Sequence, residues 1–147
     1  MNVLRNIGAV LAGIILGSIV NMGIVFLSMV VFPLPEGTNI FDPEAMKGII
    51  ASFGPPQFLF AFAAHALGTL VGAFVAAKIA TTRKKWFAIG IGLYFLYGGL
   101  TMVYKFGGPM WFMILDLAGA YIPMGWLGGK LAGGSSRPIN ESTADTA

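Results

Sequence analysis

Four long apolar segments fill most of this 147-residue chain. They cover about residues 5–32, 57–80, 86–104 and 111–131. The hydrocarbon core of a bilayer is about 30 Å thick and takes ~20 helical residues to cross, which is close to the length of each segment. The sequence therefore predicts an all-α integral membrane protein, a four-helix transmembrane bundle whose solvent is the lipid bilayer.

The composition supports one membrane domain. Apolar residues make up 56% of the chain and charged residues 10%, whereas a typical soluble domain is about 25% charged. We expect residues 1–132 to form the transmembrane domain and residues 133–147, which are small and polar, to be a disordered cytoplasmic tail. The first segment is much longer than the apolar core of a signal peptide, so we expect it to be retained as a spanning helix.

The basic residues predict the orientation of the chain. The strongest cluster is Arg83, Lys84 and Lys85, between the second and third segments. Four crossings place Arg5 and Lys130 on the same side, and cytoplasmic loops are enriched in such residues. We expect both termini to be cytoplasmic and the cluster to be a topology anchor. Specific binding of anionic lipid or nucleic acid by the cluster is the alternative. The net charge of +3 follows from topology, so we expect no nucleic-acid partner.

A short helix is predicted in the first outer loop, over residues 43–53. Asp42 can cap it, Pro43 suits its first position, and Glu44 favours the positive end of the helix dipole. Apolar residues then recur at helical spacing until Gly54. The segment is too short to span, so we interpret it as an amphipathic helix at the outer membrane interface. A lid over an outward-facing cavity is the alternative.

Rows of small residues predict how two of the helices pack. Residues four apart lie on one face of a helix, and small side chains let membrane helices approach closely. The rows are Ala9, Gly13 and Gly17 in the first segment, and Ala64, Gly68, Gly72 and Ala76 in the second. We expect these two faces to meet, or one of them to mediate self-association.

Three polar side chains stand out inside the apolar segments: Asn21, His65 and Asp116. At ~1.5 Å per residue they lie ~8 to ~16 Å from the outer ends of their segments, close enough in depth to share one cluster. The sequence offers further members. Thr69 lies one turn from His65, Tyr97 and Tyr121 could reach in, and Pro123 is expected to kink the fourth segment.

The chemistry of such a cluster would be that of an Asp–His pair. An ionisable residue inside the membrane is a candidate functional site, and a carboxylate beside an imidazole can relay a proton. The alternative is structural: Asp116 and His65 satisfy each other, Asn21 or backbone carbonyls, and so hold the helices in register.

The residues around this cluster also resemble a known family. The resemblance rests on residues 64–73 (AHALGTLVGA), on Trp111 with Asp116, on residues 120–124 and 127–129, and on Asn21. These resemble a family of small four-helix bacterial inner-membrane proteins, and the similarity covers nearly the whole chain except the tail. The resemblance implies a bacterial inner-membrane location and no established activity.

An enzyme is not expected. The chain has one histidine, no cysteine and none of the usual hydrolase, metalloprotease or phosphate-binding motifs, and we expect no metal and no cofactor. The sequence favours a non-enzymatic membrane protein whose role is packing, self-association as a homo-oligomer, or partner binding. The alternative is a small oligomeric carrier or channel that moves a proton or a small polar solute through a site containing Asp116 and His65.

Overall fold

The computed structural model describes residues 2–133, whose regular secondary structure is entirely α-helical. Its helices are α1 (Asn2–Val31), α2 (Pro43–Ala51), α3 (Pro55–Ile79), α4 (Lys84–Phe106), α5 (Met110–Gly119) and α6 (Ile122–Leu131). With α5 and α6 counted together, four helices are long and apolar enough to cross a membrane. The predicted helical class and the four apolar helices are therefore confirmed. The predicted tail lies outside the described residues, except for Gly133.

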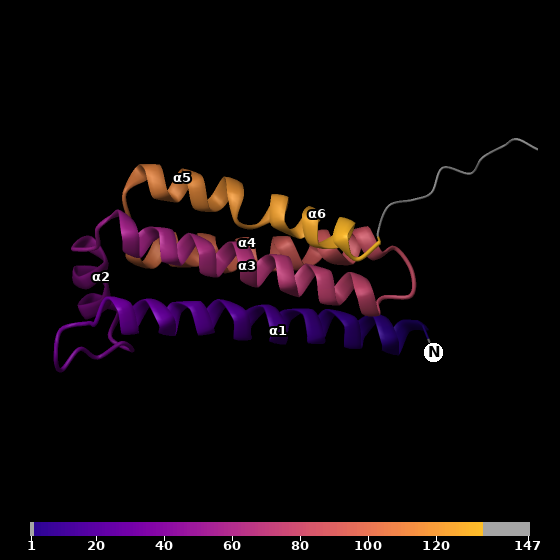
Figure 1. Ribbon diagram of the computed structural model, residues 1–147, viewed down its shortest axis with the longest axis horizontal. Coiled ribbons are helices and arrows are strands. Elements are labelled where there is room, and N and C mark those ends of the chain that lie inside the picture. The colour runs from indigo at the N-terminus through magenta and orange to yellow at the C-terminus, as the bar shows by residue number, and fades with distance from the viewer. Residues whose placement is uncertain (1, 134–147) are drawn as a thin grey trace, which may run out of the picture.

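The long helices run side by side along the length of the molecule (Figure 1). α3 is central and contacts α1, α4 and α6. The start of α1, the connection from α3 to α4 and the end of α6 lie at one end of the molecule, and α2 lies at the other (Figure 1). Arg5, Lys130 and the Arg83–Lys85 cluster therefore share one end, as a chain that crosses four times requires.

α2 begins where the sequence predicts but ends two residues earlier, at Ala51. Asp42 caps it, because an Asp42 carboxylate oxygen accepts a hydrogen bond from the Glu44 amide at 3.0 Å. At the other end, the Ser52 hydroxyl and amide both donate to the Ile49 carbonyl, at 2.6 and 2.9 Å, and close the last turn. A pocket of about 380 Å³ lies between α2, the start of α3 and the end of α4.

The two rows of small residues pack against each other. A Cβ added to Gly13 would lie 2.6 Å from the backbone oxygen of Gly72, and one added to Gly68 would lie 2.8 Å from that of Gly17. The backbones of α1 and α3 are therefore in direct contact, and any side chain at these glycines would separate them. The alanines of the two rows, Ala9, Ala64 and Ala76, and the paired glycines are all buried. This contact occupies both rows within one chain.

The fourth apolar segment is not the single helix that was expected over residues 111–131. It consists of α5 and α6, and Ala120 and Tyr121 interrupt the helix between them. Pro123 explains the break: it has no amide hydrogen to donate to Gly119, and its ring clashes with the carbonyl group one turn earlier. The predicted local kink is thus a full interruption, and it positions the polar site described next.

Candidate functional site

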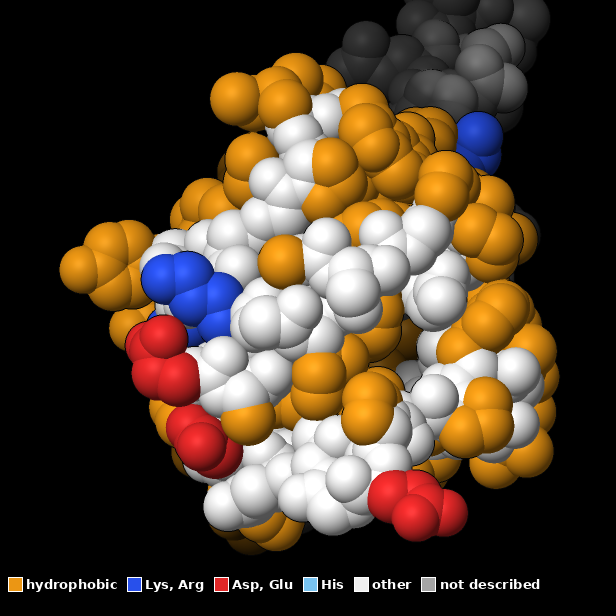
Figure 2. Space-filling view, turned by 90° about the vertical axis from the view of Figure 1, so that its left-hand side faces the viewer, with side chains coloured by type: hydrophobic (Ala, Val, Ile, Leu, Met, Phe, Trp, Pro, Cys, Tyr) orange, Lys and Arg blue, Asp and Glu red, His pale blue; other side chains and the backbone are white. Residues whose placement is uncertain are grey.

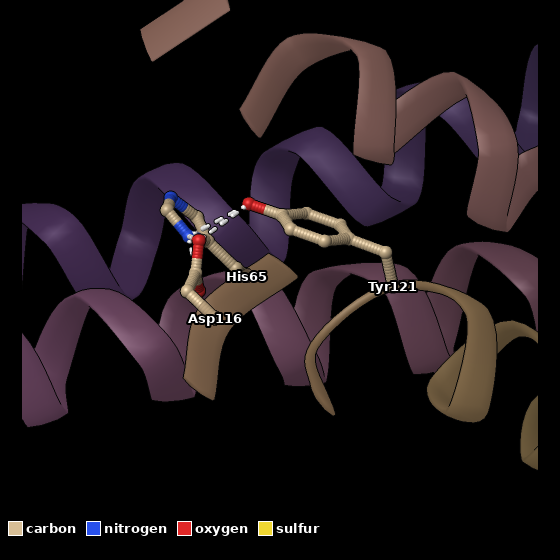
Figure 3. A network of polar contacts seen from close by, with 3 residues as sticks. All are labelled: His65, Asp116 and Tyr121. Atoms are coloured by element: carbon tan, nitrogen blue, oxygen red, sulfur yellow. Dashed lines mark hydrogen bonds and ion pairs between the residues drawn. The ribbon is translucent and has the colours of Figure 1, made fainter. Parts of the chain in front are cut away.

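His65, Asp116 and Tyr121 form a closed hydrogen-bonded triad (Figure 3). The Nδ1 atom of His65 lies 2.8 and 3.0 Å from the two carboxylate oxygens of Asp116. The Tyr121 hydroxyl donates to Asp116 Oδ2 at 2.9 Å and lies 3.0 Å from His65 Nδ1. Each side chain therefore contacts both others, and the triad joins α3 to the broken fourth span.

The break between α5 and α6 makes this arrangement possible. Tyr121 comes five positions after Asp116, and a continuous α-helix would turn their side chains ~140° apart. Instead, α5 ends one turn after Asp116, whose backbone oxygen accepts the Ala120 amide at 2.9 Å. Tyr121 then turns back over His65, so that their rings stack with centroids 5.7 Å apart and planes at 29°.

α4 packs against the Tyr121 side chain of the triad at Gly99. A Cβ added to Gly99 would lie 2.6 Å from Cζ of Tyr121 and closer still to its hydroxyl oxygen. The space that holds this hydroxyl therefore exists only because residue 99 has no side chain. Gly98, beside it, has nothing within 4 Å of an added Cβ. No periodic pattern in the sequence singles out Gly99, because its contact depends on the break in a different segment.

The triad is buried, but one nitrogen of the histidine is not engaged. Asp116 and Tyr121 are 1% and 2% exposed, whereas the His65 side chain keeps 22% of its surface exposed. With Asp116 ionised, it accepts hydrogen bonds from both neighbours, so the proton of neutral His65 sits on Nδ1. Nε2 makes no hydrogen bond within residues 2–133 and is not one of the fully buried polar atoms without a partner. It is therefore the ring nitrogen of His65 that is free to accept a proton.

The other predicted members of the cluster do not join the triad. Thr69 is fully buried, and its hydroxyl has no hydrogen-bond partner in the part of the chain that the structure describes. Asn21 is half-buried and packs on α3: a Cβ added to Gly68 would lie 2.9 Å from Asn21 Cβ. The expectation for Tyr97 is wrong, because its side chain is 73% exposed. Tyr97 lies ~200° around α4 from Gly99, on the opposite side of the helix.

Within residues 2–133, no three His, Asp or Glu side chains lie close enough together to hold a metal ion. The pocket beside α2 is lined mainly by apolar side chains, including Ile50, Phe58 and Phe106, with Lys47 among them. No member of the triad lines this pocket, so the alternative of α2 as a lid has no link to the polar site.

Comparison with known proteins returns no relative: no family model, no curated protein and no solved structure matches this chain. The geometry of the triad and the surfaces of the helices are therefore the features that indicate a function.

Proposed function

We propose that this chain is a non-enzymatic, multi-pass protein of the bacterial inner membrane that acts by association within the bilayer. The four apolar helices support a membrane location, and the family resemblance supports the bacterial inner membrane. Because Arg5, Lys130 and residues 83–85 share one end, the positive-inside rule supports a cytoplasmic location for that end and for both termini.

α2 then lies at the outer membrane interface. The end of the molecule that carries α2 shows acidic and basic side chains among uncharged ones, with hydrophobic side chains most abundant toward its edge (Figure 2). Glu36, Asp42 and Glu44, from α2 and the loop before it, are exposed. Such a surface suits contact with water and headgroups, and nine residues are too few for α2 to cross the bilayer.

In this proposal the triad is an internal lock. The observation that carries the proposal is the complete pairing of Asp116, which is 1% exposed and accepts hydrogen bonds from His65 and Tyr121. Polar groups in a hydrocarbon environment must be satisfied inside the protein, and a paired carboxylate can hold helices in one register. The triad fastens the two halves of the broken span to α3 and leaves the outer helix surfaces for association.

A proton or solute carrier is the second candidate, and two observations favour it. Nε2 of His65 is unpaired within residues 2–133, and the triad lies at an interrupted helix. Transporter sites are commonly built where spanning helices are broken. Four helices enclose too little space for a pathway, so a carrier of this kind requires an oligomer.

Asp116→Asn separates the two candidates, with Thr69→Val as a control at a buried polar residue outside the triad. For a lock, Asp116→Asn lowers the unfolding free energy by about 1–3 kcal/mol, since two hydrogen bonds are weakened, and wild-type proteoliposomes show no pH-driven flux. For a carrier, wild type shows a flux that folded Asp116→Asn abolishes and Thr69→Val retains. Asp116→Asn with unchanged stability and no flux in wild type contradicts both. Release of the chain from membranes by alkali contradicts the membrane location.

The tautomer of His65 gives a direct test of the triad itself. His65 is the only histidine, so ring ¹⁵N labelling gives one assignable pair of signals. In lipid nanodiscs we expect the proton of the neutral ring on Nδ1 and a bare Nε2 in wild type, and a change in the Nδ1 signal in Tyr121→Phe. A neutral ring with its proton on Nε2 would show that Asp116 does not accept from Nδ1.

A further inference from the structure

One face of α4 carries tyrosines that point away from the bundle. Tyr94, Tyr97 and Tyr104 are 51%, 73% and 91% exposed and recur at helical spacing. Gly90 lies on the same side of the helix. We call Gly90, Tyr94, Tyr97 and Tyr104 the tyrosine face. It lies opposite the residues that α4 buries in the bundle, which are Ala88, Ile91, Gly92 and Gly99.

α1 shows what a surface that faces only lipid looks like in this protein. Past Arg5, its exposed large side chains are aliphatic, Met or Phe, as at Leu11, Ile15 and Ile19, and Ser18 is its one exposed residue with a hydroxyl group. None of these large side chains carries a hydroxyl group that requires a hydrogen bond. The same side of α4 also exposes Leu93 and Leu100, but Tyr94, Tyr97 and Tyr104 give it three hydroxyl groups that the exposed large side chains of α1 lack.

The depth of the tyrosine face makes the difference significant. Trp86 and Tyr104 are separated by ~27 Å along α4, about the thickness of the hydrocarbon core. Tyr104 thus lies at headgroup level, where tyrosine is common. Tyr94 and Tyr97 lie ~12 and ~17 Å beyond Trp86, near the middle of the bilayer. Neither hydroxyl has a hydrogen-bond partner within residues 2–133, and lipid tails offer none.

We propose that the tyrosine face binds a second copy of this chain, in a parallel pair related by a two-fold axis normal to the membrane. A phenolic hydroxyl both donates and accepts, so the face is complementary to itself. Residues 86–104 carry no charge that would repel a copy. Gly90 has nothing within 4 Å of an added Cβ, so a second helix can approach closely there.

The packing inside the chain also directs association to α4. The glycine rows of α1 and α3 are candidates for self-association in the sequence. In the structure they already contact each other within one chain, Gly13 against Gly72 and Gly17 against Gly68. The tyrosine face stays open. This inference rests on the proposed membrane function, because the unpaired hydroxyls are costly only in a bilayer.

Cysteine crosslinking in native membranes tests the interface, because the chain has no cysteine of its own. Gly90→Cys and Leu11→Cys form a matched pair: both sites are exposed, and each lies six residues after a basic residue at the same end of the bundle, Lys84 or Arg5. We expect oxidation to give a disulfide-linked dimer with Gly90→Cys and only monomer with Leu11→Cys. Equal crosslinking of the two variants, or crosslinking of Gly90→Cys to a different protein, overturns the proposal.

A second measurement tests the tyrosine hydroxyls. In nanodiscs or liposomes we expect Tyr94→Phe with Tyr97→Phe to raise the dimer dissociation constant about tenfold, the loss for two average interhelical hydrogen bonds. Tyr104→Phe, at headgroup level, leaves it unchanged. A chain that resists alkaline extraction but is monomeric at high protein-to-lipid ratio refutes the interface alone. A chain that alkali releases refutes the membrane function on which the interface depends.

Discussion

Replacing Gly99 by alanine tests whether α4 holds the triad in place. The added Cβ would meet the hydroxyl oxygen, Cζ and Cε2 of Tyr121, with Cζ at 2.6 Å and Cε2 at 2.9 Å. Tyr121 cannot retreat freely, because its hydroxyl is bonded to Asp116 and His65. Either the ring moves and these hydrogen bonds weaken, or α4 moves away from the bundle.

The size of the effect follows from these two routes. Overpacking a well-filled site costs about 1–3 kcal/mol. Weakening two hydrogen bonds inside a membrane protein adds about 1 kcal/mol. Gly98→Ala is the matched control, because its Cβ would meet open space and alanine is the better helix former. We expect the unfolding free energies of the two variants to differ by about 3 kcal/mol, a factor of more than ~100 in the unfolding equilibrium.

The assay is reversible unfolding in detergent or bicelles, with the ring ¹⁵N signals of His65 as a report on the triad. Tyr121→Phe removes the atom closest to the added Cβ, so Gly99→Ala is expected to cost less in that background. Equal stability of Gly99→Ala and Gly98→Ala would refute the placement of Tyr121 against α4. A cost that is the same with and without the tyrosine hydroxyl would show that the clash involves other atoms.

The same unfolding assay checks three further predictions. Gly17→Ala should lower the free energy of unfolding by about 2 kcal/mol, because its Cβ would lie 2.7 Å from the Gly68 backbone oxygen. Gly23→Ala, whose Cβ would meet open space, should leave it unchanged, and equal losses would contradict the α1–α3 contact. Thr69→Val should preserve the free energy of unfolding or raise it by up to about 1 kcal/mol, because the buried hydroxyl has no partner among residues 2–133; a large loss would show a hydrogen bond there. Arg83→Gly should raise stability by about 1 kcal/mol, because Arg83 has φ of 47°; a lower unfolding midpoint would mean that the arginine side chain outweighs this strain.

The helices and their closest contact follow from local features of the sequence. A run of apolar residues long enough to cross a bilayer, or a small residue at every fourth position, expresses helix geometry whatever surrounds it. The contact of Gly13 and Gly17 with α3 is therefore accessible from spacing alone. The C-terminal end of α2 cannot be predicted in this way, because Ser52 ends that helix through hydrogen bonds that spacing does not reveal.

The site depends on geometry that spacing does not encode. Depth along the helices brings His65 and Asp116 to a similar level, but the rotation of each helix decides whether they touch. The same rotation directs Tyr97 outward, where depth alone suggests that it could join the cluster. Helical periodicity cannot predict the role of Gly99, since its partner Tyr121 comes from a non-helical position.

The break in the fourth span and the triad depend on each other. Pro123 deprives Gly119 of a helical partner, so the chain needs tertiary contacts that stabilise an interrupted helix in the bilayer. The triad supplies them, because Asp116 comes from the last turn of α5 and Tyr121 from the residue before α6, and both bind His65. A continuous helix would turn Tyr121 away from Asp116 and leave the carboxylate with one donor instead of two. The proline that weakens the helix is thus the residue that allows the carboxylate to be fully paired.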